Sequence, residues 1–236
     1  MKKFWGFLLV IVLMTSCGEY QSLLKSNDYN LVYKKAIEYY NKGDYQRAMN
    51  LLDGVRSVFV GQAKAQNIAY YRAFCSYNMK DYQIASDLFK QFIQTYPESS
   101  FAEECLYMMG FCDYKASPKP RLDQQVTEKA IREFQLYLSR YPYSMRKDKV
   151  NTYMDEMRDK LSYKAYLSAK NYYLREHYKA AVISLQNCLK DYPGSKYREE
   201  IMYMLFVSKY QMAVNSVEDK KVERYNNARE EYYYFA

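Results

Sequence analysis

The side chains best suited to binding chemistry in this sequence are tyrosines that recur in pairs, seven residues apart. Five such pairs occur: Tyr33 with Tyr40, Tyr70 with Tyr77, Tyr107 with Tyr114, Tyr166 with Tyr173, and Tyr203 with Tyr210. A tyrosine offers a flat apolar ring and a hydroxyl for backbone groups, so aligned tyrosines suit an extended peptide. The same rings could instead pack between helices, because every helix buries one face. The sequence leaves both roles open.

Catalysis has little support in the sequence. His177 is the only histidine and stands in the segment REHY, where we predict a turn residue. There is no glycine-rich phosphate loop and no paired-cysteine spacing for zinc, so no metal or other cofactor is expected. The acidic pairs are adjacent residues that diverge around a helix: Glu103 with Glu104, Glu199 with Glu200, and Glu230 with Glu231. We therefore predict a binding protein and not an enzyme.

Stacked helices are the elements that would position the tyrosines. Seven residues span about two turns of an α-helix, so each pair lies on one helix face. Three of the four intervals between pairs are 37 residues long, a period typical of helical solenoids. Small residues let neighbouring helices approach closely, and they recur at Ala48, Ala85, Ala130 and Ala181 in second helices and at Ala36, Ala73 and Ala169 in first helices.

Prolines and short turns complete the repeat. Pro97, Pro142 and Pro193 are each preceded by tyrosine and should end a second helix. With the turns KGDY (42–45), MKDY (79–82) and REHY (175–178), this spacing resembles the tetratricopeptide repeat. The predicted fold is all-α, a right-handed α-solenoid of about five tetratricopeptide-like helix pairs. In its second pair, the core is expected at Tyr82, Ala85, Phe89 and Phe92.

One interval, from Tyr107 to Tyr166, is longer than the period. Part of the excess is an insertion between the helices of the third pair, where KASPKPRLDQQVT (115–127) contains two prolines and must form a loop. The rest lies in a stretch without glycine or proline. There, residues 146–175 could form one helix of roughly 45 Å, leading from the third pair to the fourth.

The N-terminus has the features of a secretion signal. Lys2 and Lys3 precede an apolar stretch, residues 4–14, that is too short to span a bilayer. Thr15, Ser16 and Cys17 then resemble the lipobox of bacterial lipoproteins, in which the cysteine thiol is acylated. An ordinary cleaved signal with an incidental Cys17 is the alternative. Acylation by several chains, palmitate among them, would hold the protein at a membrane.

Composition adds weaker indications. Removing residues 1–16 takes away Lys2 and Lys3, so the formal net charge falls from +8 to +6. A moderately basic surface suits acidic partners or anionic headgroups, although scattered lysines explain it equally well. Nothing resembles a nucleic-acid-binding module. The remaining cysteines are expected to be small buried residues, with a disulfide between repeats left open: Cys75, Cys105, Cys112 and Cys188.

Together these features resemble one lipoprotein family. A lipoprotein signal, five tetratricopeptide-like pairs, an insertion in the third and a long helix before the fourth are similar to the BamD/ComL (YfiO) family of outer-membrane assembly lipoproteins. The similarity runs from about Leu31 to Met212. Its third-to-fourth-pair region is carried by YPYS (141–144), DKL (159–161), AKNYYLREHYKAAV (169–182) and LKDYP (189–193).

The resemblance implies a non-enzymatic subunit of the machine that inserts β-barrel proteins into the outer membrane of Gram-negative bacteria. In that family the first pairs recognise unfolded barrel substrates, and the later pairs dock the barrel-forming BamA-type subunit. A lipid anchor would place the protein on the periplasmic face of the outer membrane. The expected peptide-binding groove comprises Tyr33, Tyr40, Tyr70, Tyr77, Tyr107 and Tyr114, and the expected partner-docking residues are Tyr166, Tyr173, Arg175, His177, Tyr203 and Tyr210.

The expected organisation follows from these assignments. Residues 1–16 form the signal peptide, 17–30 a lipidated tether, 31–142 the substrate-binding half and 143–236 the partner-docking half. Aromatic residues near the C-terminus suggest that a partner or further sequence covers this end. Two alternatives stay open: a scaffold lipoprotein for peptidoglycan synthesis or secretion, and a glycan-binding lipoprotein that uses the tyrosines as sugar platforms.

Overall fold

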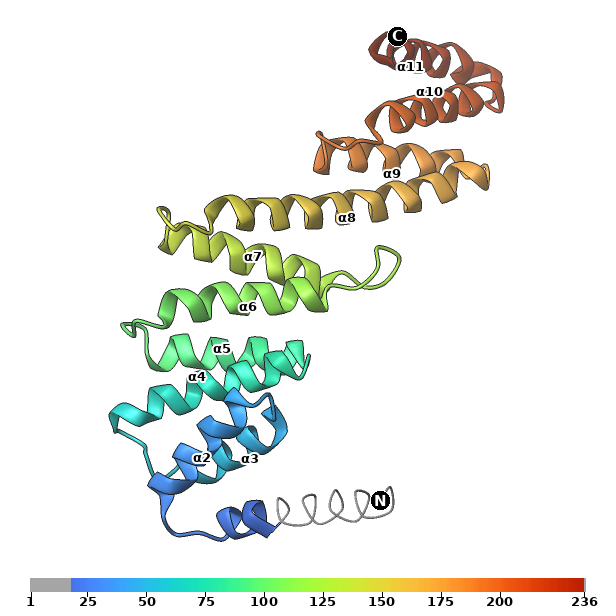
Figure 1. The fold of residues 1–236 in the computed structure, drawn as a ribbon. Helices are drawn as coiled ribbons and strands as arrows, with labels where there is room; N and C mark the ends of the chain where they lie inside the picture. Colours follow the sequence, from blue (N-terminus) through green and yellow to red (C-terminus); the bar gives the residue numbers. More distant parts are fainter. Residues whose placement is uncertain (1–17, 236) are drawn as a thin grey trace, which may run out of the picture. The chain divides into compact units, whose positions relative to one another are not determined.

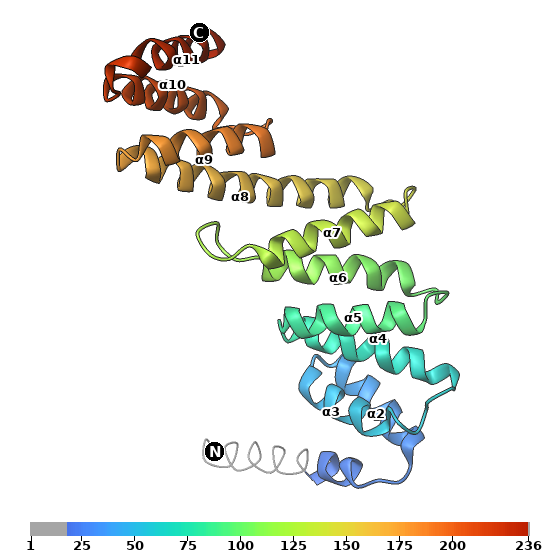
Figure 2. The same ribbon diagram turned by 180° about the vertical axis from the view of Figure 1, so that it is seen from behind.

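The computed structural model describes residues 18–235, and every regular element in that range is an α-helix. Figures 1 and 2 show helices that follow one another back and forth along the chain. A short helical segment covers residues 18–24. It is followed by α2 (Tyr29–Asn41), α3 (Tyr45–Val55), α4 (Ala63–Asn78), α5 (Tyr82–Thr95), α6 (Ala102–Ala116), α7 (Gln125–Arg140), α8 (Lys147–Leu174), α9 (Tyr178–Asp191), α10 (Arg198–Val214) and α11 (Glu218–Phe235). The predicted all-α fold of about five helix pairs is confirmed.

The chain forms two compact units. Unit 1 comprises the chain up to Ser117 together with Lys129–Lys147, and unit 2 comprises Pro118–Glu128 together with the chain from Asp148 onward. Most of the insertion therefore belongs to unit 2, which the sequence did not indicate. One contact that holds it there is a hydrogen bond of 2.7 Å from Lys164 Nζ on α8 to the carbonyl oxygen of Leu122.

The turn between the two helices of a pair has the same conformation three times. Gly43 (φ 81°), Lys80 (φ 67°) and Glu176 (φ 59°) each take the left-handed conformation two residues before a second helix begins. Glycine adopts it freely, whereas lysine and glutamate pay a steric cost there. The next residue is the N-cap of the second helix, a position that His177 occupies before α9. His177 is thus a turn residue, as predicted.

Small residues lie where the helices cross. All seven alanines that the repeat pattern singled out have an exposed fraction of 0%: Ala36, Ala48, Ala73, Ala85, Ala130, Ala169 and Ala181. The three prolines follow the ends of α5, α7 and α9 by two residues, as predicted. Phe89 and Phe92 are also buried, at 0% and 1% exposure, which confirms them as core residues of the second pair.

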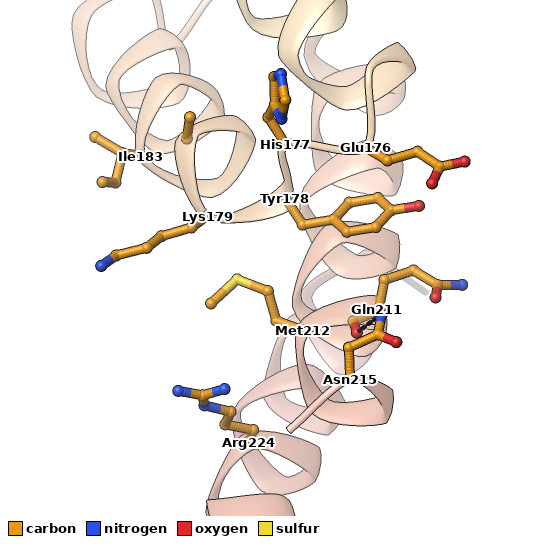
Figure 3. A pocket seen from close by; sticks show the side chains of 10 residues that line it. Glu176, His177, Tyr178, Lys179, Ile183, Gln211, Met212, Asn215 and Arg224 are labelled. Carbon is orange, nitrogen blue, oxygen red and sulfur yellow. Dashed lines mark hydrogen bonds between the residues drawn. The ribbon is translucent and has the colours of Figure 1, made fainter. Parts of the chain in front are cut away.

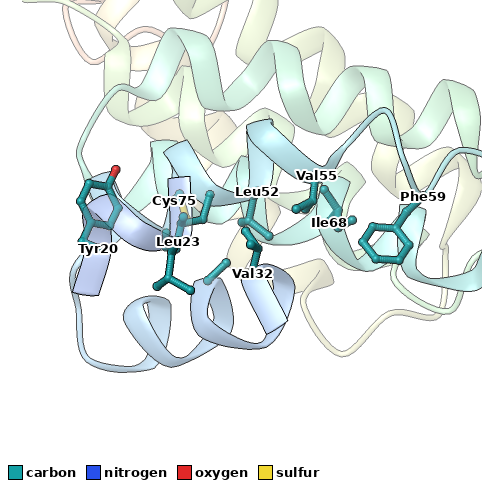
Figure 4. Close-up of a cluster of buried hydrophobic side chains, with 11 residues drawn as sticks. Tyr20, Leu23, Val32, Leu52, Val55, Phe59, Ile68 and Cys75 are labelled. Atoms are coloured by element: carbon teal, nitrogen blue, oxygen red, sulfur yellow. The ribbon is translucent and has the colours of Figure 1, made fainter. Parts of the chain in front are cut away.

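The first core of unit 1 includes the short helical segment 18–24. Figure 4 shows Tyr20 and Leu23 of this segment with side chains from α2, α3 and α4 in one cluster. Leu23 is 5% exposed, and the amide nitrogen of Asn50 on α3 donates a hydrogen bond of 3.0 Å to the Tyr20 hydroxyl. Part of the segment expected to be a tether is therefore packed against the first helix pair.

A second core joins α8, α9 and α10 of unit 2. It contains Tyr166 and Ala169 from α8, Leu185 from α9, and Ile201 and Met204 from α10. The helix α8 has 28 residues and spans Lys147–Leu174, which confirms the long helix predicted over 146–175. Its length exceeds that of its partner α9, which has 14 residues.

Buried charges connect three helices of unit 1. The Lys129 ammonium on α7 lies 2.8 Å from Asp113 Oδ2 on α6, 3.6 Å from Glu133 Oε1 and 3.2 Å from the Ser86 hydroxyl oxygen on α5. Asp113 is 1% exposed and Glu133 is 8% exposed. We call these four residues the buried ionic cluster. Its members are far apart in the sequence, and their spacing gave no sign of it.

The buried ionic cluster leaves one polar atom without a hydrogen bond. Glu133 Oε2 is buried and has no hydrogen-bond partner among the described residues. Burial, followed by the neighbouring Asp113, raises the pKa of Glu133 to about 8. Two carboxyl groups therefore share one lysine, and at neutral pH the folded state favours a proton on Glu133.

The cysteines match their predicted role. Cys75, Cys105, Cys112 and Cys188 are buried and have free thiols. Burial raises the pKa of the Cys75 and Cys105 thiols to about 12, so they stay protonated and unreactive.

Candidate functional site

The first helices of unit 1 line a groove, which we call the first-helix groove. Its volume is about 560 Å³. Tyr33 from α2, Tyr70 and Asn67 from α4, and Phe101 just before α6 are among its lining residues. Tyr33 and Tyr70, two of the six tyrosines predicted for a peptide-binding groove, thus line the same groove.

Tyr70 is held from several sides. Its hydroxyl donates a hydrogen bond of 3.2 Å to Glu104 Oε2 on α6. Its ring lies 4.5 Å from Phe74 and 4.6 Å from Phe101, measured between centroids. Burial raises the pKa of Tyr70, and the neighbouring Glu104 carboxylate raises it further. The exposed part of this ring is therefore presented to the groove in a fixed orientation.

Tyr33 lies at the other side of the groove. Its ring is 6.1 Å from Phe59, and the Lys64 ammonium is 5.8 Å from its centroid. Burial raises its pKa, and a side-chain hydrogen bond with Asn67 acts against the rise. Asn67 stands three residues before Tyr70 on the same helix face, a signal that could have identified it from the sequence.

The other four tyrosines predicted for the groove pack against aromatic neighbours. Tyr40 lies 4.9 Å from Tyr71 between centroids, and Tyr77 lies 5.9 Å from Tyr82. Tyr107 and Tyr114 both stack on Phe111, at 5.6 and 5.9 Å. Tyr107 is only 7% exposed, which leaves little of its ring for a ligand. Packing between helices is therefore an observed role of Tyr40 and Tyr77, and also of Tyr107, whose ring lies 5.9 Å from Tyr137 on α7.

Unit 2 repeats the tyrosine–glutamate contact of unit 1. Tyr166 donates a hydrogen bond of 2.7 Å to Glu200 Oε2, and the two residues are 34 apart, as are Tyr70 and Glu104. Lys170 lies 2.7 Å from Glu200 Oε1. Bonds from Lys170 and then Tyr166 lower the pKa of Glu200. One member of an acidic pair at the start of a first helix thus ties that helix to the preceding first helix.

A pocket of about 820 Å³ lies at one end of unit 2. Its lining residues come from the turn before α9, from α9 itself, from the end of α10 and from α11. Figure 3 shows Lys179, Met212 and Arg224 on one side of it and His177 near the turn. We call it the α9 pocket. It combines apolar groups with the cations of Lys179 and Arg224 and the carboxylate of Glu176. Because the cations are in excess, it suits a partner surface of mixed apolar and acidic character.

Of the six residues predicted to dock a partner, only His177 lines the α9 pocket. Tyr166 is 5% exposed and belongs to the core, and Tyr173 is half-buried. Arg175 is exposed beside the pocket. Tyr203 and Tyr210 are 46% and 44% exposed and lie near Phe235 and Tyr225.

A family model described as YfiO, outer membrane lipoprotein, matches residues 25–225 of this sequence. The chain belongs to the YfiO outer membrane lipoprotein family. The family resemblance drawn from the sequence is therefore confirmed. No curated protein matches the chain.

Two solved structures show a distant similarity to this YfiO-family protein. The TPR2AB-domain:pHSP90-complex of yeast Sti1 is 13% identical with a TM-score of 0.44, and the match covers 86% of this chain and 77% of that one. MamA AMB-1 is 13% identical with a TM-score of 0.36, and the match covers 86% and 90% of the two chains. Because both TM-scores are low, these similarities carry no argument about function.

The YfiO family and the helical-repeat fold are of a non-enzymatic scaffold type, which implies protein–protein interaction. Within residues 18–235, no group of three or more histidine, cysteine or acidic side chains is placed to hold a metal ion. None of the helices in this range is long and apolar enough to cross a membrane. Cys17 and the predicted signal sequence lie outside the described residues.

The tyrosine–glutamate contacts of this YfiO-family protein can be tested by removing one oxygen. Tyr70→Phe and Tyr166→Phe should each lower the free energy of unfolding by about 0.5–1.5 kcal/mol, the usual worth of one hydrogen bond. Urea unfolding followed by circular dichroism would measure the loss. Tyr143 is 98% exposed, so Tyr143→Phe is the matched control and should change nothing. Equal effects at all three positions would show that these contacts do not stabilise the stack.

Proposed function

We propose that this protein is a lipid-anchored subunit of the machinery that assembles β-barrel proteins in the outer membrane. In this proposal Cys17 carries the lipid and the protein faces the periplasm. Unit 1 binds unfolded barrel substrates, and unit 2 docks a BamA-type barrel protein. Membership of the YfiO outer membrane lipoprotein family supports the proposal most strongly.

The first-helix groove supports the substrate-binding part. An unfolded barrel protein presents extended backbone and aromatic side chains. The groove offers the rings of Tyr33, Tyr70 and Phe101 for apolar contact and the amide of Asn67 for backbone groups. Lys34 and Glu38 also line it. The groove can therefore pair with acidic or basic side chains of a substrate and has no strong preference for either charge. Such a lining suits many sequences rather than one.

Site-specific photo-crosslinking tests the groove. A photoreactive residue in place of Asn67 should form crosslinks to a urea-denatured barrel protein diluted into buffer with the lipoprotein. The same residue in place of Gln83, which is exposed on the second helix α5, is the control and should give few or none. Equal crosslinking at both positions would contradict binding in the groove.

The α9 pocket supports the docking part. Apolar contact is available from Ile183 and Met212, and Lys179 and Arg224 favour acidic groups of a partner. A mild-detergent pull-down of the tagged lipoprotein should recover a large barrel protein with periplasmic repeat domains. Lys179→Glu should reduce that recovery, whereas Lys25→Glu, an exposed position of unit 1, should not. Cys17→Ala should prevent membrane attachment.

The pull-down also decides between the proposal and its alternatives. Recovery of peptidoglycan enzymes, secretion components or glycan importers without the barrel protein would overturn the assembly function. In that case the scaffold character, which the family and fold carry, would stand.

A further inference from the structure

A second groove of unit 2 lies between the insertion loop and α8, and we call it the loop–helix groove. Its volume is about 540 Å³. Arg121 comes from the loop, and Lys164, Leu167, Asn171 and Leu174 come from α8. These helical residues follow one another at intervals of three or four, so they form one face of the helix. No residue of this groove lies in the first-helix groove or the α9 pocket.

The loop is held in place by hydrogen bonds rather than by regular structure. Gln124 is 4% exposed, and its amide nitrogen donates to the carbonyl oxygens of Lys119 (2.8 Å) and Leu122 (3.1 Å). Its amide oxygen accepts a hydrogen bond of 2.7 Å from the Thr127 hydroxyl. Lys164 on α8 also donates to Leu122, as described above. The backbone that carries Arg121 is therefore held by Gln124 from within the loop and by Lys164 from α8.

The groove has more positive charge than its surroundings neutralise. In the described part of the chain, Arg121 makes no ion pair, and the hydrogen-bond acceptor of Lys164 is a neutral carbonyl oxygen. Lys170 also lines the groove, but Glu200 compensates it at 2.7 Å. Two cations thus face the groove without a carboxylate. A guanidinium and an ammonium that line one groove suit a carboxylate ligand, which guanidinium groups bind through two parallel hydrogen bonds.

We propose that the loop–helix groove binds an extended, acidic segment of a partner protein. A carboxylate of the segment pairs with Arg121 and Lys164. The Asn171 amide bonds to the backbone of the segment, and Leu167 and Leu174 contact an apolar side chain beside the acid. Leu174 is 66% exposed, so it has the surface for such a contact.

The lining favours a peptide over an anionic membrane. A lipid surface is bound best by several cations on an open face, whereas here two free cations lie in a groove with leucines and an amide. The proposal does not depend on which complex the protein serves, since it concerns the chemistry of the segment bound.

Selection from a display library of short random peptides, against the full lipoprotein in detergent, tests this proposal without knowledge of the partner. Peptides selected on the wild-type protein should be enriched in aspartate and glutamate. Selection on the double variant Arg121→Gln, Lys164→Gln should lose that enrichment. The control variant Lys149→Gln, Lys220→Gln removes the same charge from exposed positions of unit 2 and should keep it.

The dissociation constant of one selected peptide, made synthetically, measures how much each cation contributes to binding. Arg121→Gln alone leaves the Lys164 contact to the loop intact and should weaken binding about tenfold or more. Absence of acidic enrichment, or equal binding to the double variant, would overturn the proposal. Vesicles of phosphatidylglycerol and phosphatidylethanolamine that bind the wild type but not the double variant, with no peptide enrichment, would assign the groove to the membrane and also overturn it.

Discussion

Lys129→Met is expected to destabilise the protein by about 3 kcal/mol or more, because it leaves the Asp113 carboxylate buried without a cation. Breaking a buried ion pair by removing one partner typically costs about 3–5 kcal/mol. We expect the lower part of that range, since the Lys129 side chain is 36% exposed while that of Asp113 is 2% exposed. Chemical denaturation at neutral pH would measure the loss.

An exposed ion pair provides the control. Lys170 and Glu200 have side-chain exposures of 35% and 45%, and surface pairs contribute about 0–1 kcal/mol. Lys170→Met should therefore cost far less than Lys129→Met. A loss of similar size in both variants would show that the buried ionic cluster contributes no more to stability than an exposed ion pair.

The same cluster gives a pH dependence of defined sign. The pKa of Glu133 is raised from an ordinary 4.5 to about 8 in the folded protein. Between these values the folded state holds a proton that the unfolded state has lost, so the contribution of Glu133 to stability falls as pH rises. Its slope is at most about 1.4 kcal/mol per pH unit. Above about pH 8, Glu133→Gln should be more stable than the wild type, and the Lys129→Met loss should shrink in acid.

Gly110→Val is expected to destabilise unit 1 by about 1–3 kcal/mol or more through overpacking. A Cβ atom at Gly110 on α6 would lie 2.9 Å from Cδ1 and 3.0 Å from Cε1 of the Phe134 ring on α7. Phe134 is fully buried, so its ring has little freedom to move aside. The steric cost should exceed the gain of up to about 1 kcal/mol that replacing a helical glycine brings.

A control at a second glycine and a substitution of Phe134 test whether the steric contact causes the loss of stability. A Cβ atom at Gly54, an exposed residue of α3, meets no atom within 4 Å, so Gly54→Val should be neutral or slightly stabilising. In a Phe134→Leu background, Gly110→Val should cost less, because the ring that it meets is gone. Thermal unfolding of the four variants would form a double-mutant cycle. Additive effects would contradict a direct contact.

Local sequence patterns were sufficient to predict the helices and their crossings. The seven alanines and three prolines act within one or two turns of chain, and the left-handed turn before α9 repeats a tetrapeptide pattern. The long helix α8 could be predicted because no glycine or proline interrupts it. Each of these features depends on a short stretch of sequence, and the structure confirms each of them.

Contacts between repeats could not be predicted in the same way. The acidic pair Glu103 and Glu104 was visible, but its bonds to Tyr137 and Tyr70 depend on how neighbouring helices stack. For the same reason the sequence could not show that Phe111 on α6 packs against Tyr77 on α4, with 6.2 Å between ring centroids. Likewise, the helical segment 18–24 is too short to have a clear period, and it is stabilised by packing rather than by propensity.

That segment limits how far an anchored protein could reach. Gly18 is covalently joined to Cys17, and consecutive Cα atoms are about 3.8 Å apart. If Cys17 carries the lipid as proposed, the anchor is followed at once by residues that are packed on the first helix pair, with Tyr20 and Leu23 in its core. There is then almost no slack between bilayer and scaffold. The first pair would stay close to the headgroups, and a force on the lipid would act directly on the core of unit 1.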